Sequence, residues 1–210
     1  MKRLKWILGG ALAVSASGCQ AQADGNPAQQ QRQLRAVPGC EGCEAAWERD
    51  PDALKPRISL AGKDEPGKPL LIRGTVLRAD GSTPAAGVVL YVYQTNAAGL
   101  YANGNNESEW SRRHGRLRGW LKTGADGRFE IRTIKPGQYP DRADPAHVHF
   151  TVLELGRDPY WIDDIVFSGE PGVDAEYRSE RENRGGPGII TLRRAGDGSL
   201  LGERNIILER

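Results

Sequence analysis

One eight-residue run, residues 88–95, limits the folds open to this chain more than any other stretch. It reads Val-Val-Leu-Tyr-Val-Tyr-Gln-Thr, with almost no polar alternation, which is typical of a strand covered on both faces. Gly and Pro are frequent, at 27 and 13 of 210 residues, and long helical periodicities are missing. The sequence therefore predicts an all-β fold.

Further apolar runs, separated by turn residues, predict the other strands of a two-sheet β-sandwich. We place this domain at residues 70–210, after an irregular segment at 41–69 that contains a short helical stretch at 44–50. Residues 169–188 read as a long charged loop. The predicted strands are 70–77, 119–123, 128–133, 146–153 and 160–167, with a closing hairpin formed by 188–194 and 201–208.

Length and charge exclude some function classes. The chain has the length of one domain and enough apolar residues to bury a core. Lys and Arg total 29 and Asp and Glu total 27, for a formal net charge of +2. The sequence shows no basic stripe and no nucleic-acid-binding motif, so we expect no nucleic-acid partner.

The first residues predict export. Three of the first five residues are basic, and the apolar run that follows at residues 6–14 is too short to span a bilayer. This pattern is typical of a secretory signal peptide. The N-terminal stretch is therefore expected to lie outside the folded domain.

The signal ends in Ala-Ser-Gly-Cys at Cys19, which resembles the bacterial lipobox, where cleavage leaves the cysteine as a lipidated N-terminus. We predict a lipoprotein signal peptide at 1–18, a tether at 19–40, and a membrane partner through the lipid. The protein would then be anchored in the bacterial cell envelope. The alternative is an ordinary signal peptide cleaved near Ala21 or Ala23.

Two further cysteines, Cys40 and Cys43, form a Cys-Glu-Gly-Cys motif. A structural zinc site would need a second pair of ligands nearby, and the sequence has none. In an exported protein the remaining states are a small disulfide or a redox-active pair. The redox state normally accompanies a thioredoxin-like βαβ pattern, which is missing, so we predict a structural disulfide.

Two of the three histidines lie on one predicted strand. His147 and His149 are two residues apart, so they share one face of the strand and stand roughly 7 Å apart, close enough to bind one metal ion. On this spacing alone, hydrogen-bonded histidines on a polar face are an equally good interpretation. The third histidine, His114, lies in a basic loop and is expected to be solvated.

Several motifs follow one another in a characteristic order over residues 70–170. Together they resemble the intradiol ring-cleavage dioxygenases, non-haem iron(III) enzymes that open catechols between the two hydroxyl groups. The resemblance implies a prealbumin-like β-sandwich. The motifs are Gly74–Val76 with Asp80–Gly81, Val92–Tyr101, Thr123–Phe129, Thr133–Pro140 and Pro145–Phe150.

In that family two tyrosines and two histidines bind the iron, and the matching residues here are Tyr101, Tyr139, His147 and His149. The resemblance implies that Tyr101 and His147 are equatorial ligands, and that Tyr139 and His149 are axial. It also implies Fe(3+) as cofactor, a catechol and O2 as substrates, and a cis,cis-muconate-type diacid as product. Tyrosinate suits the ferric ion because it is a hard, anionic oxygen donor.

The sequence departs from the family at two positions near the substrate. Asp144 stands where an arginine is common, and Asp164 where a glutamine is common; Arg142 is two residues from the first of these. If either carboxylate faces the substrate, it should repel carboxylated catechols. We therefore expect neutral catechols to be preferred, with Arg142, Asp144 and Asp164 as substrate-binding candidates.

Two rival interpretations stay open on the sequence. Residues 70–95, together with 127–131, also resemble transthyretin-like and carboxypeptidase-regulatory-like β-sandwich modules, which are often non-catalytic and need no Tyr and His set. A cupin also uses two histidines on a strand, but it needs another histidine downstream, and none follows His149. The sequence does not decide which catechol is the substrate or whether the chain forms a homo-oligomer.

Overall fold

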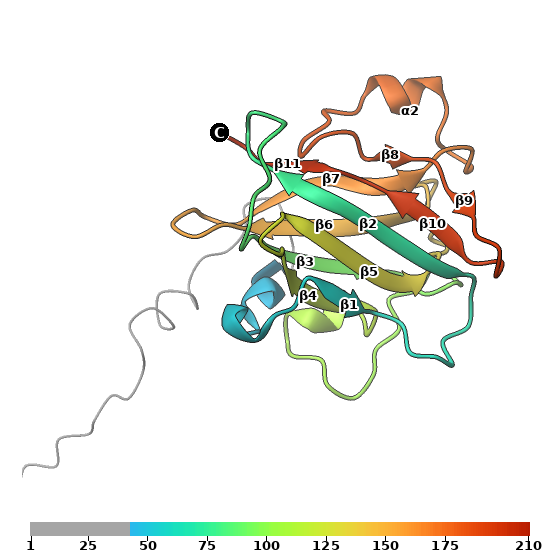
Figure 1. Ribbon diagram of the computed structural model, residues 1–210. Helices are drawn as coiled ribbons and strands as arrows, with labels where there is room; N and C mark the ends of the chain where they lie inside the picture. Colours follow the sequence, from blue (N-terminus) through green and yellow to red (C-terminus); the bar gives the residue numbers. More distant parts are fainter. Residues whose placement is uncertain (1–42) are drawn as a thin grey trace, which may run out of the picture.

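The computed structural model describes residues 43–210, in which the strands form two sheets packed face to face (Figure 1). A six-stranded sheet has the order β1-β5-β2-β10-β9, with β11 also pairing with β2, and a five-stranded sheet has the order β4-β3-β6-β7-β8. The predicted β-sandwich is confirmed. The strands are β1 (Arg57–Ser59), β2 (Pro69–Leu77), β3 (Val89–Gln94), β4 (Arg118–Lys122), β5 (Arg128–Ile134), β6 (His147–Leu153), β7 (Tyr160–Phe167), β8 (Ile189–Ile190), β9 (Arg193–Arg194), β10 (Leu200–Glu203) and β11 (Ile206–Ile207).

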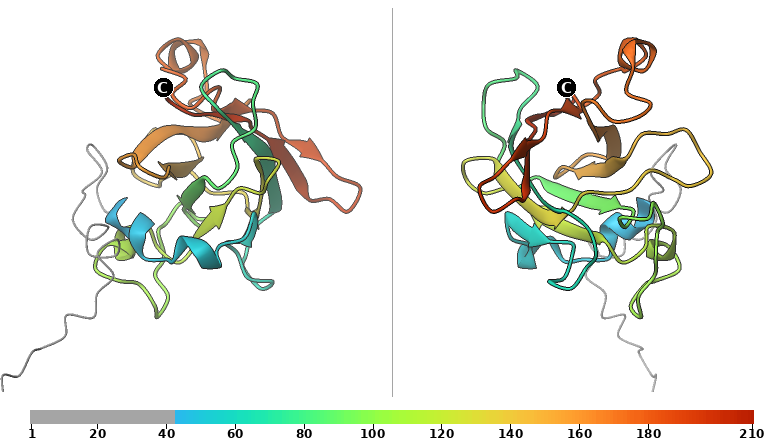
Figure 2. Two further views of the ribbon diagram at one scale, coloured as in Figure 1. Left: turned by 60° about the vertical axis from the view of Figure 1, so that its left-hand side comes forward. Right: turned by 90° about the vertical axis from the view of Figure 1, so that its right-hand side faces the viewer.

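The core lies between the two sheets, whose layers are visible in the turned views (Figure 2). Alternate residues point inward, so Ile72 of β2 and Ile131 of β5 meet in register on the inner face and are fully buried. Val148 and Phe150 of β6 point into the same core from the other sheet and are also buried. Each such side chain contributes roughly 1.5–3 kcal/mol through burial, so the interior stabilises the sandwich.

Strand β3 is buried at every position, as its unbroken apolar run predicts. Its inward residues, Leu90 and Val92, belong to the core, while Tyr91 and Tyr93 lie on the outer face of the five-stranded sheet. That outer face is covered by two short 3-10 helices, η1 (Cys43–Trp47) and η3 (Ser111–Arg113), which lie beside the sheet (Figure 1). The outer face of this sheet is therefore partly shielded from solvent outside the core.

Three elements differ from the sequence-based expectations. The segment at 41–69 is not wholly irregular, because β1 adds a parallel edge strand to β5, after a 3-10 helix η2 (Pro51–Ala53). The charged loop contains a short helix, α2 (Ala175–Ser179), which Asp174 caps by accepting the Tyr177 N–H. In the expected closing hairpin, β9 pairs with β10, but β8 joins the other sheet beside β7. β1, α2 and β8 are each too short to show the periodic pattern of apolar residues by which a strand or helix is predicted.

The N-terminal predictions fall outside the described residues. These are the signal peptide at 1–18, the tether at 19–40, the lipidated Cys19, and Cys40 of the expected disulfide with Cys43. They stay predictions. Along residues 43–210, no helix combines the length and the apolar character needed to cross a membrane.

Candidate metal centre

Strand β6 presents two histidines on the outer face of the five-stranded sheet. His147 and His149 alternate with Val148 and Phe150, which are 0% and 1% exposed in the core. Since successive strand side chains point to opposite faces, burial of the apolar pair directs both imidazoles outward. Their Nε2 atoms lie 2.9 Å apart, so the strand brings two nitrogen donors to one point.

Two loops bring the tyrosines to the same point, and two glycines allow the loops to touch. Gly99, at φ +79°, follows β3, and Gly137 follows β5; a Cβ at either would collide with the backbone of the other loop. Only glycine tolerates this approach. With the loops in contact, the hydroxyl oxygens of Tyr101 and Tyr139 lie 2.6 Å apart.

The two pairs of donors form a closed ring. Tyr101 Oη lies 2.8 Å from His149 Nε2, and Tyr139 Oη lies 3.1 Å from His147 Nε2. Donors bound at right angles to one ion, at about 2.0–2.1 Å each, would lie about 2.9 Å apart. The structure therefore brings together all four residues that the family resemblance implied, at the spacing of ligands around one ion.

Hydrogen bonds on the far side of each imidazole decide which ring nitrogen carries a lone pair. His147 Nδ1 lies 2.6 Å from the Pro145 carbonyl oxygen, which can only accept, so Nδ1 carries the hydrogen. His149 Nδ1 likewise donates to Asp164 Oδ1 at 2.9 Å. Both Nε2 lone pairs then face the point shared with the two tyrosine hydroxyls, where they can accept a hydrogen bond or bind a cation. The donor set fits a metal ion.

Burial sets the protonation of the donors. It lowers the pKa of His147, which keeps that ring neutral and able to ligate. Burial raises the pKa of Tyr101, and the hydrogen bond that its hydroxyl donates to Tyr139 acts in the same direction; burial also raises the pKa of Tyr139. Both phenols hold their protons in the protein alone. A hard, highly charged cation at the two oxygens would reverse this.

We expected Asp164 to face the substrate, but in the structure it accepts a hydrogen bond from His149. Its Oδ1 binds His149 on the ring nitrogen opposite the one that faces His147. Burial alone would raise the pKa of Asp164, but His149 and the nearby Arg181 charge hold it below its usual range. Ligand atoms of Asp164 and the two histidines lie within 4.8 Å of one another. The hydrogen bond nevertheless assigns this carboxylate to holding the ring.

A cavity of about 580 Å³ opens beside the donors. Arg142 lines it, with its guanidinium carbon 5.8 Å from the centre of the Tyr139 ring. Asp144 is exposed and lies outside this lining, so the structure separates the two aspartates that the sequence grouped. The lining residues are Tyr93, Tyr101, Arg113, His114, Tyr139, Arg142, His149, Phe150, Thr151, Trp161, Ile162 and Asp164.

His114 is buried, and the expectation that it is solvated was wrong. It is 3% exposed, and its ring stacks on Tyr93 beside the metal centre. Flanking arginines suggested solvent, but η3 turns the imidazole inward against the aromatic outer face of β3. Sequence reasoning also missed Tyr93. Its place in the β3 run, on the face opposite the core, was the available signal.

The sequence matches a known family over most of its length. The profile of the family described as Dioxygenase matches residues 47–185. The chain is 39% identical over 132 residues to the catechol 1,2-dioxygenase 1 of Acinetobacter lwoffii, which covers 50% of this chain and 42% of that relative. The chain spans about half the length of the curated relatives it matches.

Solved structures agree with this match. The dioxygenase domain of a dioxygenase carbohydrate-binding protein fusion from Streptomyces sp. SirexAA-E has a TM-score of 0.58 and 27% identity, covering 84% of this chain and 97% of that one. An intradiol ring-cleavage dioxygenase from Tetranychus urticae shares the fold, with a TM-score of 0.55 and 20% identity, covering 78% and 90%. With the family profile matched over residues 47–185, the chain belongs to the intradiol ring-cleavage dioxygenase family.

Proposed function

We propose that this protein binds iron(III) and uses O2 to cleave a catechol-type aromatic diol to a cis,cis-muconate-type diacid. The observation that carries the proposal is the closed ring of donor atoms, in which two imidazole lone pairs face each other at 2.9 Å. A β-sandwich module that only binds a partner would have no use for two imidazole and two phenol donors that converge on one point. The four ligands are Tyr101, Tyr139, His147 and His149.

Bound to these four residues, iron(III) would supply Lewis acidity and a redox-active centre for the reaction of the diol with O2. The protein's own groups handle the protons. We assign Tyr139 as the base that would take a catechol proton at Oη, the role that the family resemblance gives this tyrosine. Burial raises the pKa of Tyr139, so the free phenol holds that proton, while Arg142 acts in the opposite direction and assists its later release.

The cavity beside the donors would hold the diol. Trp161, Thr151 and Ile162 line it with an apolar or uncharged wall suited to a flat ring. Asp164 lines the cavity and keeps its negative charge while it accepts from His149, whereas Asp144 is exposed outside the lining. Repulsion of carboxylated catechols would therefore come from Asp164 and, more weakly, from Asp144, and on that basis we keep the preference for neutral catechols as a proposal.

We also propose that the protein is exported and anchored through a lipid on Cys19. The support is the basic start, the short apolar run and the lipobox-like Ala-Ser-Gly-Cys. Cys19→Ser should move the protein from the membrane fraction to a soluble or unprocessed form. Wild-type protein that is released without detergent would contradict the anchor.

Oxygen uptake by the purified, iron-loaded protein tests the activity. Catechol should consume one O2 per diacid formed, and the resting protein should be coloured by charge transfer from tyrosinate to iron. Tyr101→Phe should perturb that colour most, and Tyr139→Phe should keep iron but slow catechol binding. Tyr160→Phe, whose hydroxyl bonds Glu154 away from the site, is the matched control. Colourless wild-type protein with stoichiometric zinc and no O2 uptake would reject the proposal.

A further inference from the structure

We propose that Tyr93 and His114 form a stack that sets the plane of the metal ligand His149; the inference rests on the proposed function because it needs a metal at that site. Tyr93 of β3 pairs directly with His149 of β6, and their rings lie 4.4 Å apart at 21°. His114 covers the other face of Tyr93, at 3.8 Å and 11°. The rings of His149, Tyr93 and His114 are therefore stacked nearly parallel, and His114, directly after η3, is the outermost of them.

The outer ring of the stack is firmly held. His114 is 3% exposed, and its Nδ1 lies 2.7 Å from the hydroxyl of Tyr91, which is fully buried on the same strand as Tyr93. A ring that is buried on its faces and hydrogen-bonded at its edge has few rotamers open to it. His114 is thus a fixed wall against which Tyr93 rests.

The two histidine ligands are supported in different ways. His147 Nδ1 donates a hydrogen bond to the carbonyl oxygen of Pro145, two residues earlier in the chain. His149 depends on side chains from other elements, with Asp164 of β7 at Nδ1 and Tyr93 of β3 on its face. Its orientation is therefore the one that distant residues can change.

The hydrogen bond and the stack control different motions of His149. A single bond at Nδ1 fixes the direction of that edge, but it leaves the ring able to tilt about the bond. Contact with the flat face of Tyr93 removes the tilt, which aims the Nε2 lone pair at the point shared with His147 and Tyr101. Groups that orient a ligand in this way typically change metal affinity by about 10–100-fold when they are lost. Tyr93 and His114 are positioning residues.

Two replacements of similar volume at position 114 test the stack. His114→Phe keeps a flat ring against Tyr93, whereas His114→Leu fills the space without one. The measurement is the rate at which a large excess of a hydroxamate chelator removes iron from the folded protein, together with the charge-transfer band. We expect release from His114→Leu to be about 10-fold faster or more, with a shifted band, and His114→Phe to stay near wild type.

A control separates this effect from a general loss of stability. Leu153→Ala opens a cavity on the same sheet face, in the same buried cluster, at the end of β6 that pairs with Val89 rather than with Tyr93. It should lower the melting temperature but leave iron release unchanged well below that temperature. The proposed stack would be overturned if His114→Leu released iron at the wild-type rate. It would also be overturned if His114→Phe or Leu153→Ala accelerated iron release as much as His114→Leu does. Failure of wild-type protein to take up iron would instead reject the proposed function.

Discussion

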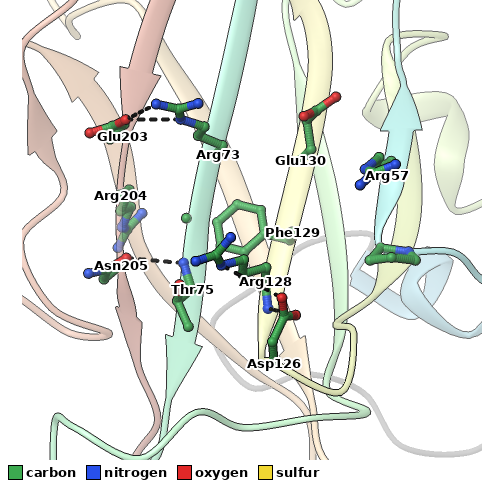
Figure 3. A pocket seen from close by; sticks show the side chains of 12 residues that line it. Arg57, Arg73, Thr75, Asp126, Arg128, Phe129, Glu130, Glu203, Arg204 and Asn205 are labelled. Carbon is green, nitrogen blue, oxygen red and sulfur yellow. Dashed lines mark hydrogen bonds and ion pairs between the residues drawn. The ribbon is translucent and has the colours of Figure 1, made fainter.

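The two sheets share one core but have opposite outer faces. The outer face of the six-stranded sheet is open to solvent and carries arginines paired with carboxylates, such as Arg73 with Glu203 at 2.6 Å (Figure 3). The outer face of the five-stranded sheet carries tyrosines and histidines beneath η1 and η3. Trp120 of β4 holds η1 against this face, because its Nε1 donates to the carbonyls of Ala45 and Ala46 at 3.1 Å. The same fold thus supports a solvated surface and a covered site.

The comparison shows that cavity size does not identify the site. The hollow on the charged face has a volume of about 670 Å³, larger than the 580 Å³ beside the donors (Figure 3). Arg73 and Arg128 on this face pair with Glu203 and Asp126, and water screens these exposed pairs. The donors on the other face are half-buried and converge on one point, where a cation is favoured. The convergence of donors, rather than volume, marks the chemistry.

Removal of a proposed metal ligand should give the largest difference between the faces. His149→Ala leaves three donors, and water cannot restore the lost one. We expect iron content and kcat/KM both to fall by more than about 100-fold, beyond the range for the loss of a supporting group. Metal analysis and O2 uptake measure the two effects. Full iron occupancy in His149→Ala would remove this residue from the ligand set.

Asp164→Asn tests the support behind that ligand. The amide keeps the shape of the carboxylate but loses its charge, so it holds the His149 N–H more weakly. Iron affinity should fall by about 10–100-fold while the fold is retained. Chelator competition reports the affinity. If affinity is unchanged and only the ratio of catechol to protocatechuate turnover shifts, Asp164 faces the substrate, as the sequence first indicated.

The sequence predicted much of the site because the chemistry is local in the chain. The spacing of His147 and His149 on an alternating strand fixes their common face, and the glycine-containing loops of Tyr101 and Tyr139 match family motifs. The partner of Asp164 was not predictable, since it depends on an irregularity in the pairing of β6 with β7. A one-residue shift there changes which side chain meets the ligand.

Buried polar residues were the other limit. Arg204 is 2% exposed between the sheets, with its guanidinium carbon 5.5 Å from the centre of the Phe150 ring. Among residues 43–210, none of its guanidinium nitrogens has a hydrogen-bond partner. Charged residues are rarely buried unpaired, so the residue type alone predicts that Arg204 is exposed to solvent. The same reasoning was wrong for His114. Tertiary packing overrides that preference at both positions.

Acid should destabilise the aromatic face through His114. Burial lowers the pKa of His114 to about 3, whereas the unfolded chain has a value of about 6.5. Stability is therefore complete above about pH 6.5 and falls as the pH decreases toward 3, by on the order of 3 kcal/mol between pH 7 and 4. Urea unfolding of the iron-free protein across this range should show a flatter profile for His114→Phe. Parallel profiles would assign the acid sensitivity to other groups.

Asp144→Asn should have a small effect that is confined to substrate choice. Its side chain is exposed and lies outside the cavity lining, so solvent screens its charge. We expect the ratio of kcat/KM for protocatechuate to that for catechol to rise by only about 2- to 5-fold, with unchanged iron content. Steady-state kinetics with both substrates provide the measurement. An unchanged ratio would leave substrate preference to the shape of the cavity.

The smallest effect is expected on the charged face. Arg73 and Glu203 are each about half exposed, at 52% and 49%, and exposed ion pairs add little to stability because water and salt screen them. Arg73→Ser should therefore keep the melting temperature within about 2 °C and leave kcat/KM and iron release at wild-type values, although it opens the larger cavity further. Matched thermal unfolding and O2 uptake test this. A large loss of activity would show that the open face takes part in function, and the contrast between the two sheets would then fail.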